Sequence, residues 1–195
     1  MLPEKIIFLG VLLNLIGEFS YVLGIVYGNV KPNLVSWFIW MLSPFIAVFF
    51  QLKAGAGLSV LPVFMAGFGP FLVILVSAIK RNTQWKISRF DIVCGACAVI
   101  ALFLYILTHN LEISIFFLVL SEFLAVIPTL KKAWSFPETE SGYIFLCAIV
   151  SNILGLLIIK EWSFTIYSYG LSLIIINIAL VVSIYRKKIL LWYNP

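Results

Sequence analysis

Two glutamates stand alone inside long apolar runs of the chain. Glu18 lies 12 residues beyond Ile6, where the first run begins, and Glu122 stands at a similar depth in the fifth run. At about 1.5 Å per residue Glu18 lies roughly 18 Å into a helix, near the midplane of a bilayer. A carboxylate at that depth costs at least about 2.5–3.5 kcal/mol on insertion scales, so it should face a cavity or a partner.

The chemistry available to these two side chains is binding or proton uptake. No Lys or Arg lies in the same runs to neutralise them, which favours protonation or an exogenous cation. We therefore predict that Glu18 and Glu122 flank one central path and bind a polar or cationic solute. The alternative is that each hydrogen-bonds a neighbouring helix and only fixes the packing.

A few further polar or aromatic side chains inside apolar runs are candidates for the same site. An amide in an apolar run needs a partner or a wet cavity, which makes Asn177 a candidate for solute binding or for helix-to-helix hydrogen bonding. Asn14 and Asn152 are similar candidates, and Trp40 is deep enough in its run to stack on a solute. Pro44, Pro70 and Pro128 each remove a helical hydrogen bond, so we expect hinges there.

Enzymatic, metal and cofactor chemistry have little support. Cys94 and Cys97 form a C-x-x-C pattern, but it lies in a continuous apolar stretch without a second ligand pair. No nucleophile, base and orienting group can be assembled from the other residues. We expect no cofactor, no metal and no enzyme activity.

The composition sets the class of protein. Of 195 residues, 63% are hydrophobic and 11% are charged, against about 45–50% and about 25% in soluble domains. With a mean hydropathy of +1.14 we predict an all-α integral membrane protein, because the apolar runs are continuous rather than alternating. Seven spans are expected: Ile6–Tyr27, Leu34–Leu52, Leu58–Ile79, Ile92–Leu107, Ile113–Leu130, Gly142–Ile159 and Thr165–Tyr185.

The basic residues predict an orientation. Three Lys or Arg lie on the side of the N-terminus and ten lie on the other side. The positive-inside rule then places the N-terminus outside and the C-terminus in the cytoplasm, with the cell membrane as the expected location. Because the basic clusters flank spans, the net charge of +5 needs no nucleic acid to explain it.

The chain also contains an internal repeat. Gly17-Glu18-Phe19 resembles Ser121-Glu122-Phe123 at an offset of 104, and two further matches follow at offsets of 105 and 106. A nearly constant offset predicts two parallel three-helix units joined by a linker helix. The expected division is a first unit at 1–90, the linker at 91–110 and a second unit at 111–195.

This 3+1+3 arrangement resembles the SWEET and PQ-loop superfamily of seven-helix membrane transporters. The most specific stretch runs from Ala125 to Ser141, where Pro128-Thr129 stands in place of Pro-Gln. The first unit has no matching proline, so a divergent member is implied. In that family an Asn in the last helix of each unit helps to bind the solute, and Asn177 is the match in the second unit.

Two functions follow from the sequence. The first is transport of a small polar solute by alternating access between the repeats, with facilitated diffusion and proton coupling through Glu18 and Glu122 both open. The second is a seven-helix receptor or sorting protein that binds a ligand in the bundle without flux. Membrane lipids and a small polar solute are the expected partners, nucleic acid is not, and a homo-oligomer is left open.

Overall fold

The protein is a bundle of helices in the computed structural model, which describes residues 3–80, 85–104, 107 and 110–193. The described residues contain no strand. Three short 3-10 helices, η1 (Glu4–Ile6), η2 (Gly57–Val60) and η5 (Pro137–Thr139), accompany the longer ones. The α-helices are α1 (Ile7–Val26), α2 (Leu34–Lys53), α3 (Leu61–Ile79), α4 (Arg89–Leu104), α5 (Leu111–Ser135), α6 (Gly142–Leu157) and α7 (Phe164–Tyr193).

Local signals explain where these helices begin and end. The chain leaves α1 through Gly28, whose φ of +77° lies in the left-handed region that favours glycine. Asn33 then caps α2, because its side-chain oxygen accepts a hydrogen bond from the Val35 amide at 3.2 Å. Asn110 caps α5 in the same way, accepting from the Glu112 amide at 2.8 Å.

Five helical segments are long and apolar enough to cross a membrane: Glu4–Val26, Leu34–Lys53, Gly57–Ile79, Leu111–Ser135 and Phe164–Arg186. This indicates a multi-pass membrane protein, as the composition predicts. Of the other two expected spans, α6 has 16 residues and the described part of α4 also has 16. Such a helix is roughly 24 Å long, less than the ~30 Å of a bilayer core.

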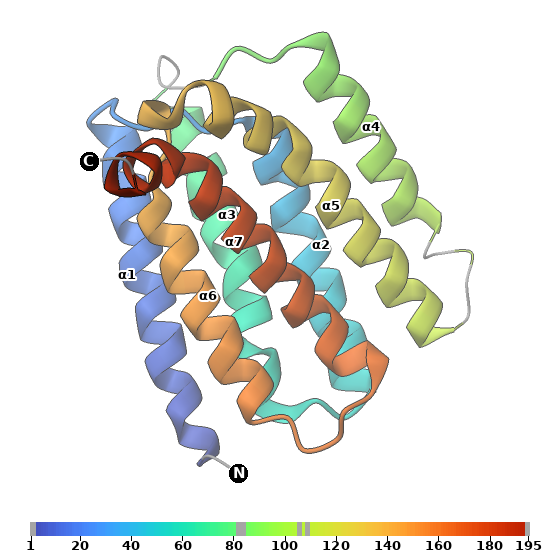
Figure 1. Ribbon diagram of the computed structural model, residues 1–195. Coiled ribbons are helices and arrows are strands. Elements are labelled where there is room, and N and C mark those ends of the chain that lie inside the picture. Colours follow the sequence, from blue (N-terminus) through green and yellow to red (C-terminus); the bar gives the residue numbers. More distant parts are fainter. Residues whose placement is uncertain (1–2, 81–84, 105–106, 108–109, 194–195) are drawn as a thin grey trace.

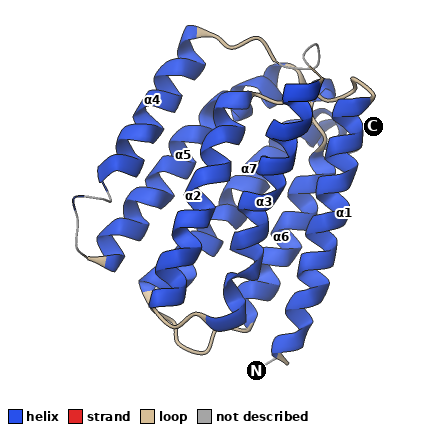
Figure 2. Cartoon of the chain, turned by 180° about the vertical axis from the view of Figure 1, so that it is seen from behind, coloured by secondary structure: helices blue, strands red, loops and turns tan. Residues whose placement is uncertain are grey.

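Six helices form a ring, and α4 lies outside it (Figures 1 and 2). The third helix α3 packs against both α1 and α2, and α7 packs against both α5 and α6. The ring closes because α1 also packs against α6, and α2 against α5. The helix α4 packs mainly on α5 and more lightly on α2.

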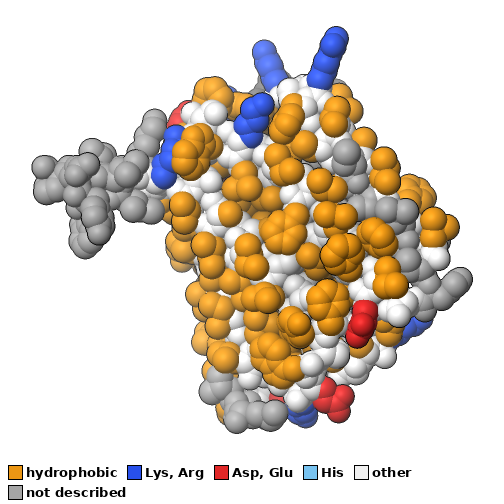
Figure 3. All heavy atoms as spheres, turned by 45° about the vertical axis from the view of Figure 1, so that its right-hand side comes forward, with side chains coloured by type: hydrophobic (Ala, Val, Ile, Leu, Met, Phe, Trp, Pro, Cys, Tyr) orange, Lys and Arg blue, Asp and Glu red, His pale blue; other side chains and the backbone are white. Residues whose placement is uncertain are grey.

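The outer surface matches a lipid environment. Large apolar side chains such as Phe19 and Phe103 are exposed on the flanks of the bundle. Figure 3 shows such side chains over most of one face, with Lys and Arg side chains at its upper rim. Since water would make so much exposed apolar surface costly, the face is suited to lipid.

The two ends of the bundle differ. The α1–α2 and α5–α6 connections and the described residues of the α3–α4 connection lie at the end where the described part of α7 finishes (Figure 1). The first described residues lie at the opposite end (Figure 1). We call the first of these the basic end, because it includes Lys31, Lys80, Lys86, Arg89, Lys131, Lys132 and Arg186.

Candidate functional site: a central cavity with two buried carboxylates

A cavity of about 60 Å³ lies inside the ring, and each of the six ring helices contributes to its wall. A water molecule needs roughly 10–15 Å³ of such volume, so a few fit. Five of the predicted site residues line this cavity: Glu18, Glu122, Asn177, Trp40 and Asn14. The fold therefore brings together side chains from α1, α2, α5 and α7 that are far apart in the sequence.

Asn152 does not reach this cavity. It lines a separate cavity of about 10 Å³ together with Gln51. Its amide nitrogen donates to the carbonyl of Ala148, one turn earlier in α6, at 2.9 Å. The structure thus separates Asn152 from the two glutamates, because Asn152 lies one turn farther along α6 than Ala148, which lines the central cavity.

Glu122 is held by a hydrogen-bonded chain that crosses three helices. The hydroxyl of Tyr169 in α7 donates to Glu122 Oε1 in α5 at 2.7 Å. Tyr169 is also 2.7 Å from the hydroxyl of Ser43 in α2. When the phenol proton points to the carboxylate, Ser43 is the donor to the phenol oxygen. All three residues are at most 1% exposed, so the chain fixes the position of Glu122.

Glu18 has a different environment. It is 4% exposed, and its Oε2 atom has no hydrogen-bond partner among the described residues. Its carboxyl group packs directly on the backbone of Gly69 in α3. A Cβ atom added at Gly69 would lie 2.7 Å from Glu18 Oε1 and 2.8 Å from its Cδ. The two carboxylates therefore share a cavity but differ in how they are held.

We expect Gly69→Ala to displace the Glu18 carboxyl group while the helix itself is kept. Alanine favours a helix by about 0.5–1 kcal/mol over glycine, so α3 should remain folded. Loss of solute binding with little change in thermal unfolding is the expected result.

Gly170→Ala is the matched control for this substitution. Its added Cβ would meet nothing closer than Leu156 at 3.4 Å. Ligand affinity and the unfolding midpoint of both purified variants provide the check. Equal affinities for the two variants would contradict the assignment of Glu18 to the site.

The other three predicted residues in the cavity wall, Asn14, Asn177 and Trp40, differ in their contacts. Asn14 donates to the hydroxyl of Ser151 in α6 at 2.7 Å, so it also links two helices. Asn177 donates to the carbonyl of Leu173 in its own helix at 2.7 Å. Trp40 packs edge-on against Trp37 with ring centroids 5.4 Å apart. Its buried Nε1 has no hydrogen-bond partner among the described residues, so a donor is available in the wall.

The three expected hinge prolines occupy different places. Pro70 lines the cavity, as does Ala66 one turn earlier. Because proline has no N–H, the Ala66 carbonyl lacks its usual helical donor. Pro44 and Pro128 are buried inside α2 and α5 but are not part of the cavity wall. Hinge motion at all three stays a prediction.

The α5 helix is tied to α2 beside Pro128. The hydroxyl of Ser36 in α2 donates to the Ala125 carbonyl at 2.6 Å. Thr129, which stands in the Gln position of the PQ-like stretch, donates to Ser36 Oγ at 2.8 Å. These bonds connect the α2–α5 junction of the ring next to the expected hinge.

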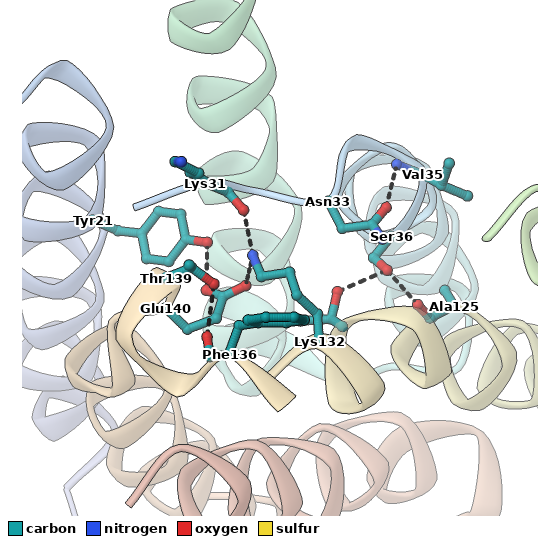
Figure 4. Close-up of polar contacts among 11 residues, drawn as sticks. Tyr21, Lys31, Asn33, Val35, Ser36, Ala125, Lys132, Phe136, Thr139 and Glu140 are labelled. Carbon is teal, nitrogen blue, oxygen red and sulfur yellow. Dashed lines mark hydrogen bonds and ion pairs between the residues drawn. The ribbon is translucent and has the colours of Figure 1, made fainter. Parts of the chain in front are cut away.

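A buried ion pair lies at the basic end of the bundle (Figure 4). Lys132 Nζ in α5 is 2.6 Å from Glu140 Oε1, and both side chains are at most 1% exposed. Tyr21 in α1 donates to Glu140 Oε2 at 2.7 Å, and Lys132 also donates to the Lys31 carbonyl. We call Tyr21, Lys31, Lys132 and Glu140 the basic-end cluster.

The basic-end cluster adjoins the cavity wall. Tyr21 packs on Trp37, with ring centroids 4.7 Å apart, and Trp37 lines the cavity. The cluster therefore connects α1 and the α1–α2 loop to α5 and the α5–α6 loop just beyond the cavity.

Three of these features were not among the predicted site residues. Tyr169 stands near the start of the last apolar run, where tyrosine is typical of a membrane interface. Lys132 and Glu140 stand among loop charges. The sequence signal for the ion pair is that both residues lie within the PQ-like stretch from Ala125 to Ser141.

Metal and thiol chemistry gain no support from the part of the chain that the structure describes. No group of three or more His, Cys, Asp or Glu that could hold a metal occurs in that part. Cys94 is buried, and the side chain of Cys97 lies outside the described residues.

Comparisons of the chain with protein-family models, with curated proteins and with solved structures found no match.

Proposed function

We propose that this protein transports a small polar solute across a membrane by alternating access. The observation that carries the proposal is the central cavity between α1–α3 and α5–α7, with Glu18 and Glu122 in its wall. Buried carboxylates inside a membrane bundle are costly unless they serve a ligand, a proton or a structural partner. In this mechanism α1–α3 and α5–α7 are the two moving units, and α4 links them.

The helix packing supports two equivalent units. In each unit the third helix lies against both of the others, as α3 does with α1 and α2, and α7 with α5 and α6. The contacts between the units are also reciprocal, since α1 meets α6 and α2 meets α5. Reciprocal packing is the expected geometry for parallel repeats related by an axis along the membrane normal.

The basic-end cluster suggests how one side of the path is closed. If the basic end is cytoplasmic, as the positive-inside rule implies, the N-terminus is outside and the cluster lies on the cytoplasmic side of the cavity. Opening toward the cytoplasm then requires Tyr21 and Lys31 to separate from Glu140 and Lys132. The proposal therefore includes a cytoplasmic closure made of charged groups.

Uptake by reconstituted protein tests the proposal. The purified protein in liposomes is screened with small polar solutes, with protein-free liposomes as the blank. Saturable uptake is expected, whereas binding without flux would favour the receptor function. An imposed proton gradient that raises the uptake rate would distinguish proton coupling from facilitated diffusion.

A further inference from the structure

Glu18 lines two spaces at once. It belongs to the wall of the central cavity, and it also lines a groove of about 1020 Å³ on the outer surface of α1. No other residue is shared by these two linings. From Leu15 to Tyr27 the groove follows α1 over roughly 18 Å, at 1.5 Å per residue. Glu18 is therefore the residue at which the groove and the central cavity adjoin, and a molecule in the groove lies next to it.

The groove has an apolar wall. Ile16 and Phe19 of α1 are exposed beside it, and Leu72 and Val76 of α3 complete it further inward. In a membrane such a groove faces hydrocarbon, so its occupant must present apolar surface along most of its length. A polar solute of the kind proposed for the central cavity does not fit this requirement.

The end of the groove at Glu18 has the opposite character. The Glu18 side chain is buried, with 4% of the residue exposed, and its Oε2 atom lacks a hydrogen-bond donor among the described residues. The Ala66 carbonyl, in a residue that lines the central cavity with Glu18, lacks its usual helical donor because of Pro70. The linings of the groove and the cavity include no Lys, Arg or His. Two acceptors without a cation call for a ligand with charged N–H donors.

Glu122 is less suited than Glu18 to bind a ligand that lies in the groove. It lines the cavity but not the groove, and the Tyr169 hydroxyl already donates to its Oε1. The Ser43–Tyr169 chain therefore holds Glu122 in place within the cavity. Of the two carboxylates, Glu18 is the one available to a ligand that comes from the bilayer.

We propose that Glu18 binds the primary ammonium group of an amphipathic amine whose hydrocarbon part lies in the groove along α1. The charged N–H groups of such a ligand supply the donors that Oε2 lacks, and the chain covers exposed apolar surface of α1. The site goes beyond the proposed transport activity, because binding there needs no flux of the amine.

Equilibrium binding of dodecylamine tests this site. The full-length protein is placed in phosphatidylcholine nanodiscs, and radiolabelled dodecylamine bound to empty nanodiscs is subtracted. Saturable binding is expected, with competition by unlabelled dodecylamine and without competition by dodecanol, which has the same chain and no charge. Equal competition by dodecanol in the wild-type protein would overturn the proposal without any variant.

Two pairs of variants locate the site. Glu18→Gln is expected to weaken binding by roughly tenfold or more, the scale of a lost charge-assisted hydrogen bond. Glu112→Gln removes an exposed carboxylate that lies in neither lining and should leave the affinity near the wild-type value. Ile16→Trp fills the groove and should also weaken binding. Ile178→Trp, at a side chain with 46% exposure against 45% for Ile16, lies outside the groove and should not.

Wild-type affinity in Glu18→Gln, or equal affinities for the two tryptophan variants, would overturn the proposal. The binding assay is independent of transport. Uptake of a polar solute with no amine binding would reject this site alone, whereas amine binding without uptake of any solute would reject only the transport proposal.

Discussion

Replacing Lys132 with methionine is expected to destabilise the protein by about 3–5 kcal/mol, the usual cost of removing one partner from a buried ion pair. Methionine keeps most of the apolar stem but removes the charge. Glu140 would then lie buried without its cation, and the Lys31 carbonyl would lose a charged donor. The unfolding midpoint of the purified protein in a mild detergent, under heat or in SDS, measures the effect.

Lys131→Met is the matched control. It removes the same charge from the preceding residue of α5, but Lys131 is exposed and contacts the Phe90 ring at 4.3 Å. An exposed cation of this kind contributes about 1 kcal/mol or less. Equal unfolding midpoints for the Lys131 and Lys132 variants would show that the pair is not buried in the folded protein.

The double variant Lys132→Met with Glu140→Gln removes both charges of the ion pair. It leaves no uncompensated charge, and the new amide still accepts from Tyr21. We expect it to recover part of the stability that Lys132→Met loses. With Glu140→Gln alone as the second single variant, the cycle gives the coupling energy of the pair. If the cluster closes the cytoplasmic side, the double variant should also change the rate of uptake.

The sequence is informative about the helices because their signals are local. Continuous apolar runs are sufficient to place a helix within a few residues, and the structure adds the caps Asn33 and Asn110 at the starts of α2 and α5. The expected run at Ile92–Leu107 overlaps α4, and the run at Gly142–Ile159 corresponds to α6, which ends two residues earlier at Leu157. Apolar composition continues into the α6–α7 connection, so it overestimates the length of α6.

Some residues of the cavity wall could also be predicted from the sequence. A Glu or Asn in an apolar run must face something polar, so Glu18, Glu122, Asn14 and Asn177 could be selected without a structure. The same rule selects Asn152, yet it lies in a different cavity, because a polar residue's need for a partner does not specify which helix junction supplies it.

The basic-end cluster could not be predicted from the sequence. Lys132 and Glu140 stand in stretches where charges normally meet water, and there they count only toward the orientation of the chain. Their burial depends on the way the α1–α2 and α5–α6 connections fold over each other, with the Lys31 amide donating to the Thr139 carbonyl at 3.1 Å. Such a contact joins residues about a hundred positions apart and leaves no local pattern.

Glutamine at both Glu18 and Glu122 is expected to reduce saturable solute uptake by roughly 10- to 150-fold, the factor that corresponds to about 1.5–3 kcal/mol for a hydrogen bond to a charged group. The fold should survive. A glutamine at position 122 still accepts the Tyr169 hydroxyl, and at position 18 it replaces a buried carboxyl group whose Oε2 has no partner among the described residues.

Glu112→Gln provides the control for charge alone, since Glu112 is an exposed acid in the first turn of α5. Uptake into liposomes should be unchanged in that variant and reduced in the double variant, with similar thermal unfolding in both.

The single variants Glu18→Gln and Glu122→Gln show how much of the loss of uptake comes from each carboxylate. A larger loss for Glu18→Gln than for Glu122→Gln indicates that Glu18 contacts the solute, because Glu122 is already held by the Ser43–Tyr169 chain. Wild-type uptake in the double variant would leave both carboxylates with only a packing role, and the transport proposal would lose the observation that carries it.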